Sequence, residues 1–442
     1  MKYVSAITPE LTEQFRAAFE ADKTLNALKL MMNRSELADA AFDRENAAKV
    51  NFTFNVEIPT TGITNQKRSG RCWLFASMNL MRELVIKKCN LAEFELSGNW
   101  LAFWDKFEKI NYYLECSMDS AALPLDDRTV SWLNGGIGDG GQWDMMVSLI
   151  KKYGIVPMSA MPETAQSCST AGLMRQINSK LREDGLELRA LLAEGKDPAP
   201  RKQEMLQEMF NALVICLGMP PKTFDFEYMD KDKAYHVDRG LTPHSFMEKY
   251  VGIDLGEYVS IINAPTADKP FHRTYTVKYI GNVVEDGILY LNLPMDEMKA
   301  LAVAQMQAGE PVWFGSDCGK SGDRSTGIWD VDSFDYSTVL GGMQFGLTKQ
   351  QRLDSGDSAM NHAMLLCGVN LDENGKPNRW KIENSWGAEA GNKGYYVCSD
   401  RWFDQFTYQV IINKKFLSAD QLAMLEQAPV VLNPWDPMGT LA

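Results

Sequence analysis

The chain has 442 residues, 45% of them hydrophobic and 10% aromatic, so it is long enough to build more than one hydrophobic core. Its formal net charge of −13 argues against the basic surface that nucleic-acid binding requires, and a nucleic-acid partner is not expected. The eight cysteines show no C-x-x-C or other close pairing. This indicates reduced thiols and predicts neither a disulfide framework nor a metal site.

The N-terminal region is predicted to be helical. Residues 1–5 lack the apolar stretch of a signal peptide, and no run in the chain has the length of a membrane-spanning helix. We therefore expect a cytoplasmic protein without a membrane partner. After Thr8-Pro9-Glu10, the apolar residues Leu11, Phe15 and Phe19 follow at helical spacing. Residues 1–48 are interpreted as a helical extension before the core.

Cys72 begins the next helical pattern, in the predicted region 49–163. Apolar or small residues recur there three or four positions apart: Trp73, Ala76, Ser77, Leu80, Met81 and Leu84. The positive end of the helix dipole lowers the pKa of a thiol toward the reactive thiolate, so a cysteine on the first turn is a candidate nucleophile. Most free cysteines are buried core residues, however, and the assignment depends on partners elsewhere in the chain.

Residues 136–141 form a glycine-rich stretch that allows two interpretations. Their sequence fits G-x-G-x-x-G, the fingerprint of dinucleotide binding, but the preceding residues 131–134 are a poor strand and residues 157–162 are loop-like. The second interpretation is that Gly140 and Gly141 form the wall of a peptide-binding cleft. Backbone without side chains lets an extended peptide approach closely enough to hydrogen-bond, and we favour this interpretation.

The second half of the chain changes from helical to strand-like patterns. Between residues 164 and 220, Leu173, Ile177 and Leu181 lie at helical spacing, with breaks at Gly195 and at residues 197–200. We interpret residues 164–244 as a helical insertion. From 245 to 415, strand patterns dominate at residues 275–277, 312–314 and 395–398. The overall prediction is an α+β fold, with helices against a mostly antiparallel sheet.

His362 is the histidine best placed to serve a cysteine nucleophile. It begins an apolar, strand-like run, and a turn at residues 372–377 and a second strand lead to Asn384. A hairpin of this kind brings Asn384 back to His362, where the amide oxygen can accept from the imidazole and Trp386 can shield the bond from water. The other histidines lie in charged, loop-like or strand-entry positions: His236, His244 and His272.

Taken together, these blocks resemble the papain-type cysteine peptidases, and most closely their bleomycin hydrolase and aminopeptidase C branch. The resemblance extends along essentially the whole chain and is carried by residues 66–77, 103–106, 139–146, 361–363, 384–387 and 435–442. It implies a papain-like two-lobed fold, with a helical lobe at 49–163 and an antiparallel β-barrel-like lobe at 245–415. His362 and Asn384 follow Cys72 by about 300 residues, roughly twice the usual papain spacing, which agrees with an insertion.

The same resemblance implies roles for individual residues. Cys72 would be the nucleophile, His362 the base, Asn384 the group that orients the imidazole, and Gln66 the side-chain donor of the oxyanion hole. The residues expected to contact substrate are Gly140, Gly141, Asn361, Trp386, Leu441 and Ala442. No metal or organic cofactor is implied. Two positions differ from papain: Ser69 stands where papain has a disulfide-forming cysteine, and Asn361 where papain has an acid.

The last residues are a second functional feature of the sequence. Pro429, Pro434 and Pro437 favour an extended segment. The apolar anchors within the predicted arm 416–442 are Trp435, Met438 and Leu441. A disordered terminus is the alternative. In the aminopeptidase C branch the last residues lie in the unprimed side of the cleft. The resemblance therefore implies that the Ala442 carboxylate meets the ammonium group of the substrate.

We thus expect a cytosolic cysteine aminopeptidase of broad specificity that cleaves short peptides through a thioester intermediate. The resemblance also implies a homohexamer whose active sites face an internal cavity. One alternative is a hydrolase or acyltransferase that uses the same three groups on a non-peptide amide or thioester, which a comparison of peptide and other amide substrates would separate. Another is a catalytically idle scaffold or nucleic-acid binder, which a salt-dependent DNA-binding assay would test.

Overall fold

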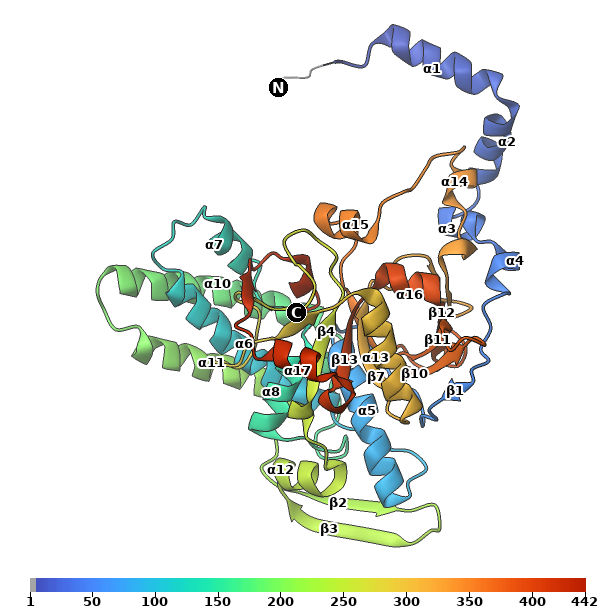
Figure 1. Cartoon of the computed structure of the whole chain (residues 1–442). Coiled ribbons are helices and arrows are strands. Elements are labelled where there is room, and N and C mark those ends of the chain that lie inside the picture. The colour runs from blue at the N-terminus through green and yellow to red at the C-terminus, as the bar shows by residue number, and fades with distance from the viewer. Residues whose placement is uncertain (1–4) are drawn as a thin grey trace.

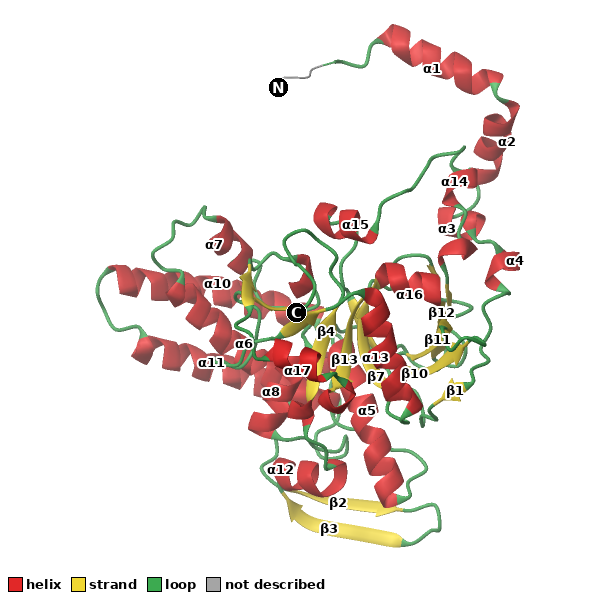
Figure 2. Cartoon of the chain, viewed as in Figure 1, coloured by secondary structure: helices red, strands yellow, loops and turns green. Residues whose placement is uncertain are grey.

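A computed structural model describes residues 5–442. Residues 1–4 belong to the N-terminal stretch in which no signal peptide is predicted, and they lie outside the described residues. A large twisted sheet forms the centre of the molecule (Figure 1). Long helices gather on one side of this sheet, a two-stranded hairpin lies at one end, and an N-terminal arm projects away from the rest (Figure 2). Helices and strands thus combine in one chain, in agreement with the predicted α+β class.

The N-terminal arm consists of short helices, the first two of which project away from the rest of the molecule (Figure 1). They are α1 (Pro9–Ala21), α2 (Lys23–Met32), α3 (Leu37–Ala41) and α4 (Arg44–Ala47). Thr8 and Asp22 cap the first two, because their side chains accept hydrogen bonds from backbone N–H groups of the first turn. Neither α1 nor α2 buries a single residue. Their stability in isolation is therefore marginal, since most helical stability comes from packing.

The helical side of the molecule is built around the helix that carries Cys72. Its members are α5 (Cys72–Cys89), α6 (Gly98–Asp119), α7 (Arg128–Leu133) and α8 (Trp143–Tyr153). Nearly every residue of α5 is buried, because α6 and α8 pack on one side and the strand that carries His362 packs on another. A helix that is apolar around its whole circumference belongs in the interior. Burial of α5 fixes the position of Cys72 at its first turn.

The predicted insertion is helical only in part. Helices α9 (Ala165–Cys168), α10 (Ala171–Ala193) and α11 (Ala199–Leu217) follow the predicted pattern, and α10 and α11 pack on α6. The prediction of helix is wrong for residues 224–241, which form the antiparallel hairpin of β2 (Phe224–Met229) and β3 (Tyr235–Leu241), followed by α12 (Pro243–Phe246). The reason is aromatic packing: Phe226 contacts Phe94 and Phe246 at ring distances of 5.8 and 5.2 Å.

The central sheet of the described chain has twelve strands. They are β1 (Val56–Glu57), β4 (Tyr258–Ile262), β5 (Arg273–Val277), β6 (Tyr290–Asn292), β7 (Val312–Ser316), β8 (Gly322–Asp323), β9 (Ile328–Trp329), β10 (His362–Leu371), β11 (Pro377–Glu383), β12 (Tyr395–Ser399), β13 (Thr407–Asn413) and β14 (Val430–Leu432). Most neighbours are antiparallel, and the parallel pairs are β4–β6, β5–β14 and β9–β12. Strand β10 lies between β7 and β11, so His362 begins a strand held on both sides.

The remaining helices cover the sheet or lie beside its edges. They are α13 (Met295–Gln307), α14 (Tyr336–Val339), α15 (Lys349–Ser355), α16 (Asp400–Phe406) and α17 (Ala419–Leu425). Two buried apolar clusters result, one that includes the residues of α5, α6 and α8 and one that includes the residues of β10, β11 and α16. Within residues 5–442 no helix combines the length and the apolar character needed to cross a bilayer.

Candidate active site

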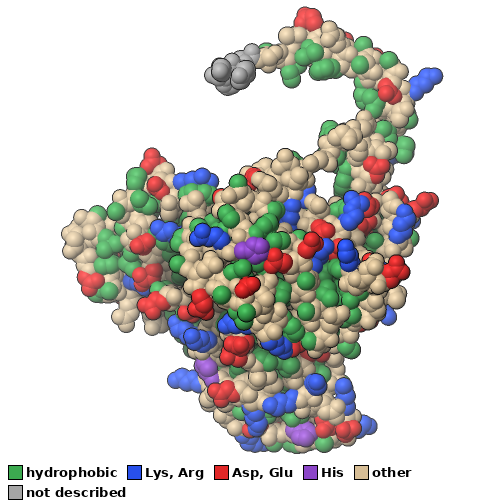
Figure 3. Space-filling model, in the orientation of Figure 1, with side chains coloured by type: hydrophobic (Ala, Val, Ile, Leu, Met, Phe, Trp, Pro, Cys, Tyr) green, Lys and Arg blue, Asp and Glu red, His purple; other side chains and the backbone are tan. Residues whose placement is uncertain are grey.

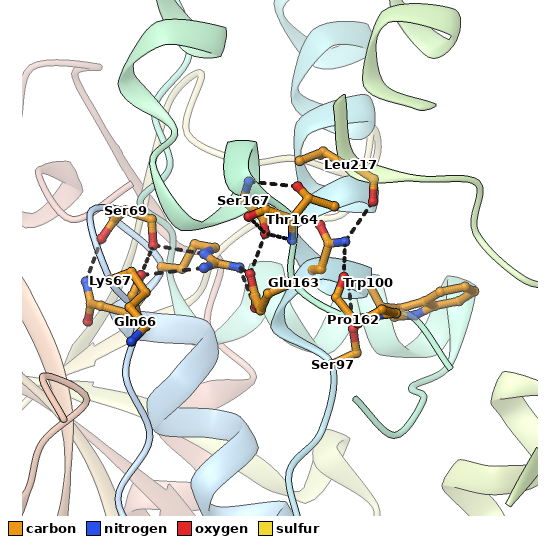
Figure 4. A network of polar contacts seen from close by, with 12 residues as sticks. Gln66, Lys67, Ser69, Ser97, Trp100, Pro162, Glu163, Thr164, Ser167 and Leu217 are labelled. Atoms are coloured by element: carbon orange, nitrogen blue, oxygen red, sulfur yellow. Dashed lines mark hydrogen bonds and ion pairs between the residues drawn. The ribbon is translucent and has the colours of Figure 1, made fainter. Parts of the chain in front are cut away.

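Cys72 is held at the start of α5 by a loop with many internal hydrogen bonds. The Gln66 backbone N–H donates to the Ser385 carbonyl (2.8 Å), and the Ser69 hydroxyl donates to the Gln66 carbonyl (2.5 Å). Arg71, which is almost fully buried, donates through Nη1 to both carboxylate oxygens of Glu163 at 2.9 and 3.0 Å. Figure 4 shows Gln66, Ser69 and Glu163 in this network. The loop is therefore rigid before any substrate binds.

The predicted pair of His362 and Asn384 is present. The Nε2 atom of His362 lies 2.9 Å from the Oδ1 atom of Asn384, so the imidazole N–H donates to the amide oxygen. Trp386 stacks on the imidazole with ring centroids 4.7 Å apart and planes 22° from parallel. Both His362 and Asn384 are buried. This arrangement fixes the orientation of the ring and leaves Nδ1 free to act as a base.

The thiol of Cys72 lies against the backbone N–H of Ala363, the residue after His362, so the strand that begins at His362 reaches the nucleophile. Burial raises the pKa of Cys72 to about 11, and the N–H groups of Ala363, Trp73 and Cys72 itself offset only part of that rise. Burial likewise lowers the pKa of His362 to about 4. Desolvation therefore outweighs the backbone N–H groups at the start of α5, and the expected lowering of the thiol pKa is not seen for Cys72 taken alone.

Gln66 lies beside the nucleophile loop in a fixed orientation. Its Oε1 atom accepts from the Ser385 hydroxyl (2.7 Å), and its Nε2 atom donates to the Ser69 carbonyl (2.6 Å). A primary amide carries two N–H bonds, so one remains for another acceptor. Ser385 belongs to the block that contains Asn384, and it therefore links the predicted oxyanion donor to the strand end that orients the imidazole.

The two glycines of the predicted cleft wall have different neighbours. A Cβ atom on Gly140 would overlap the carbonyl of Leu441, and its nearest neighbours all belong to the C-terminal arm. A Cβ atom on Gly141 would instead meet the Trp73 ring. Gly140 thus lets the backbone of the C-terminal arm approach closely, and a contact between Gly140 and substrate stays a prediction. Gly141 allows the Trp73 ring of the nucleophile helix to pack, and a contact between Gly141 and substrate stays a prediction.

Asp139 joins the glycine wall to the nucleophile loop, a role that the sequence interpretation missed. Its carboxylate accepts from the Gly70 backbone N–H (3.2 Å) and from the Thr170 hydroxyl, and it forms an ion pair with the buried Lys106. Burial acts to raise the pKa of Asp139, but Lys106 and these donors lower it to about 2. The Asp139 carbonyl also accepts from the Trp73 indole N–H (2.8 Å). A stable carboxylate thus holds the two sides of the site together.

The C-terminal arm follows a fixed path to Gly140. Strand β14 pairs with β5, Asp436 forms a buried ion pair with Lys269 (2.7 Å), and the Met438 carbonyl accepts from the Tyr290 hydroxyl (3.2 Å). The Thr440 hydroxyl donates to the Met360 carbonyl (2.9 Å), two residues before His362. Leu441 is buried, and Ala442 is half-buried. The arm is therefore ordered within the described chain, and its end lies close to both the glycine wall and the histidine strand.

Asn361 precedes His362, but its side chain is occupied by other contacts. Its Nδ2 atom donates to Asp317 (2.6 Å), and its Oδ1 atom accepts from the Cys318 backbone N–H (3.2 Å). These bonds fix the turn after β7. A contact between Asn361 and substrate stays a prediction.

All eight cysteines, which lie within residues 5–442, are unpaired, and no group of His, Cys, Asp or Glu in that range is arranged to hold a metal ion.

Comparisons with known proteins agree with this geometry. The profile of the peptidase C1-like family matches residues 6–439. The chain belongs to this family. Aminopeptidase C of Streptococcus thermophilus is 46% identical over 99% of this chain and 100% of its own length, and aminopeptidase C of Listeria monocytogenes is 45% identical over 99% of both chains. The crystal structure of PepW from Lactobacillus rhamnosis HN001 has a TM-score of 0.97 and 47% identity, and covers 99% of this chain and 100% of that one.

Within the peptidase C1-like family, these relatives place the chain in the aminopeptidase C branch. It is a papain-like cysteine peptidase of the aminopeptidase type. The family assignment from residues 66–77, 139–146 and 361–387 is thus confirmed. The catalytic role of each individual residue stays a prediction.

Proposed function

We propose that this peptidase removes N-terminal residues from short peptides, with Cys72 as the nucleophile and His362 as the base. The observation that carries the proposal is the position of the last residues, with Leu441 against Gly140 and Thr440 bonded to the strand end that leads to His362. Substrate residues that would lie on the N-terminal side of the scissile bond meet the chain's own terminus there. Only one residue of a peptide can therefore lie on the N-terminal side of the scissile bond.

The first chemical step is transfer of the thiol proton from Cys72 to His362. Burial disfavours each ion when it forms alone, but this transfer creates a thiolate and an imidazolium side by side, and their attraction offsets the desolvation cost. The thiolate attacks the carbonyl carbon of the first substrate residue. The oxyanion that forms is placed to accept from the Cys72 backbone N–H and from the remaining Nε2–H of Gln66.

The intermediate then breaks its carbon–nitrogen bond. His362 gives its proton to the departing amine, and the first residue remains bound to Cys72 as a thioester. A water molecule loses a proton to His362 and attacks this thioester. Collapse of the second tetrahedral species releases the free amino acid, and the proton on His362 returns to the sulfur. Asn384 keeps Nε2 of the imidazole occupied through both steps, so that Nδ1 alone exchanges protons.

The Ala442 carboxylate is the proposed recognition group for the substrate ammonium. Within residues 5–442 it forms no ion pair with a lysine, an arginine or a histidine, whereas Asp436, earlier in the arm, is paired with Lys269. An unpaired carboxylate in a partly buried position gains from the approach of a cation. This gain applies to an α-ammonium group and is absent for an internal peptide bond, which favours exopeptidase over endopeptidase cleavage.

The proposal also covers the specificity, the two-lobed architecture, the location and the assembly of this peptidase. Broad side-chain specificity is supported by the resemblance to the aminopeptidase C branch, and a division into two lobes is supported by the two separate apolar clusters. A cytoplasmic location is supported by eight unpaired cysteines, because a reducing compartment preserves free thiols. A homohexamer with an internal cavity is supported by the projecting arm, along which Figure 3 shows hydrophobic side chains at the surface.

The test uses one mixed set of peptides and aminoacyl-naphthylamides, with products identified by mass. The wild-type protein is expected to release free N-terminal amino acids, and Cys72→Ala is expected to lose at least about 10³-fold in rate. Removal of residues 439–442 is expected to reduce aminopeptidase activity and to produce internal cleavage. A fully active Cys72→Ala variant would contradict the nucleophile, and an unchanged product pattern after truncation would remove the arm from the mechanism.

A further inference from the structure

Arg324 places an unpaired cation next to the proposed base. It lies in the loop between β8 and β9, and its guanidinium carbon is 4.0 Å from the centre of the Trp386 ring. Trp386 in turn stacks on His362. Arg324, Trp386 and His362 therefore form a continuous stacked series from the loop to the proposed base.

The charge of Arg324 has no partner in the described part of the chain. Lys320, in the segment between β7 and β8, pairs with Asp357 at 3.1 Å, whereas none of residues 5–442 offers Arg324 a carboxylate within ion-pair distance. The adjacent carboxylate of Asp323 is occupied by hydrogen bonds from Ser325 and Thr326. Arg324 is also exposed, so its N–H groups are accessible. The guanidinium lies over the face of Trp386, a contact that uses none of its N–H groups and leaves them able to donate.

The leaving part of the substrate must pass this position. The C-terminal arm closes the cleft at Gly140, so the peptide beyond the scissile bond extends away from Gly140. The departing amine must lie within hydrogen-bond reach of His362, because that residue supplies its proton. Trp386 covers His362, and Arg324 contacts Trp386. A leaving peptide that passes His362 therefore extends over Trp386 toward Arg324.

We propose that Arg324 binds the free C-terminal carboxylate of the leaving peptide. Ring centroids 4.7 Å apart for His362 and Trp386, and 4.0 Å from the Trp386 ring to the Arg324 guanidinium carbon, put Arg324 at most about 9 Å from His362, a span of two or three extended residues at about 3.3 Å each. A guanidinium fork binds a carboxylate through two parallel hydrogen bonds. The inference rests on the proposed aminopeptidase function and narrows its substrate class to peptides with two or three residues after the scissile bond and an unblocked C-terminus.

The experiment compares tripeptides and tetrapeptides that carry a free C-terminal carboxylate with the same peptides as C-terminal amides. Wild-type protein is expected to show a lower KM for the acids than for the amides. In Arg324→Met the ratio of kcat/KM for acid over amide is expected to fall about 5- to 10-fold, mainly through KM, because a charge-assisted hydrogen bond is lost. Arg324→Lys is expected to lie in between, since lysine keeps the charge without the fork.

Lys320→Met is the matched control, because it removes a cation that lies four residues earlier in the chain and already has an acidic partner. Its acid-over-amide ratio is expected to equal that of the wild type. Equal loss for acids and amides in Arg324→Met, or no preference in the wild type, would overturn the role of Arg324 while the aminopeptidase function stands. Failure of wild-type protein to release amino acids from any of these peptides would overturn the proposed function and this inference with it.

Discussion

At the scale of single residues, burial shifts the pKa values of Cys72 and His362 in opposite directions, and the chemistry of Cys72 depends on both shifts. Burial raises the pKa of the thiol to about 11 and lowers that of His362 to about 4. A solitary thiolate is thus rare at neutral pH, and a solitary imidazolium is rare above about pH 4. The two charges become favourable only when they form together. The reactivity of the thiol therefore depends on the position of His362.

Removal of the imidazole is predicted to change the pH dependence of the Cys72 alkylation rate. In His362→Gln the thiolate of Cys72 forms without a counter-charge, so its alkylation rate is expected to rise about tenfold per pH unit from pH 7 toward pH 11. Wild-type protein is expected to react faster at pH 7 and to depend less on pH. The measurement is the rate of Cys72 modification by iodoacetamide, followed by peptide mass. His272→Gln is the control, because that exposed histidine pairs with Glu297 instead. Identical pH profiles for wild type and His362→Gln would contradict the ion pair.

The two adjacent glycines predict two separable phenotypes. In Gly140→Ala the new methyl group overlaps the Leu441 carbonyl, so the arm is displaced and internal peptide cleavage is expected with little loss of stability. In Gly141→Ala the methyl group meets the buried Trp73 ring, and a loss of about 1–3 kcal/mol is expected from overpacking. Product masses and denaturant midpoints distinguish the two. Each variant serves as the control for the other, and the same defect in both would contradict this division of roles.

At the scale of elements, a buried ion pair connects the nucleophile helix to the strand that leads to Asn384. Arg82 of α5 donates to Glu383 of β11 at 2.6 Å, and both side chains are almost fully buried. Arg82 also donates to the Gly62 carbonyl (2.8 Å). Removal of one partner leaves an uncompensated charge in the interior, which usually costs more than the intact pair contributes. The pair therefore fixes how α5 and β11 are placed relative to one another.

Arg82→Met is accordingly expected to lose about 3–5 kcal/mol of unfolding free energy at pH 7. The double variant Arg82→Met/Glu383→Gln is expected to recover most of that loss, because no fully buried unpaired charge remains; Glu83, which also contacts Arg82 at 3.2 Å, is partly exposed. Burial raises the pKa of Glu383 to about 6 even beside Arg82, so the folded single variant binds a proton more tightly than the unfolded chain does. Its deficit should therefore shrink as the pH falls to 5. Denaturant unfolding at pH 5 and 7 tests this, and a pH-independent deficit would contradict it.

The sequence predicts local features of this fold better than distant contacts. The helix that begins at Cys72 and the hairpin that joins His362 to Asn384 were both predictable, because each depends on a periodic pattern within about 25 residues. The pairing of Arg82 with Glu383 was not predictable, since these residues are 301 positions apart. Local pattern also failed for the pKa of Cys72, because burial is a property of the whole site.

The hairpin of β2 and β3 and the roles of the glycines show the same limit. Residues 224–229 have alternating burial that follows from contacts with Phe94 and Phe246, which lie on other elements. Gly140 and Gly141 are neighbours in sequence, but one faces the C-terminal arm and the other faces Trp73. Only the packing around each glycine distinguishes them. The family resemblance supplied the site residues, and the structure supplied the contacts that position them.

At the scale of the whole molecule, the N-terminal arm is the part that is incomplete in a single chain. Helices α1 and α2 bury no residue, and Phe15, Leu30 and Met31 are 62%, 70% and 66% exposed. Phe345, on the loop after α14, is also exposed. Isolated helices of this length are marginal in water, and exposed apolar side chains gathered in one region are typical of an interaction surface. A second copy of the chain in the proposed hexamer is the partner that would cover them.

Removal of residues 1–35 is therefore expected to reduce the molar mass of the assembly in solution, as measured by light scattering coupled to size exclusion. Leu30→Glu/Met31→Glu is expected to have the same effect without shortening the chain, because it places charges where apolar contact is needed. Lys29→Glu in the same helix is the control and is expected to leave the mass unchanged. Cys72 lies in a buried apolar cluster and His362 is buried, whereas α1 and α2 bury no residue, so naphthylamide hydrolysis should persist in the smaller species. An unchanged mass in both arm variants would show that α1 and α2 do not hold copies of the chain together.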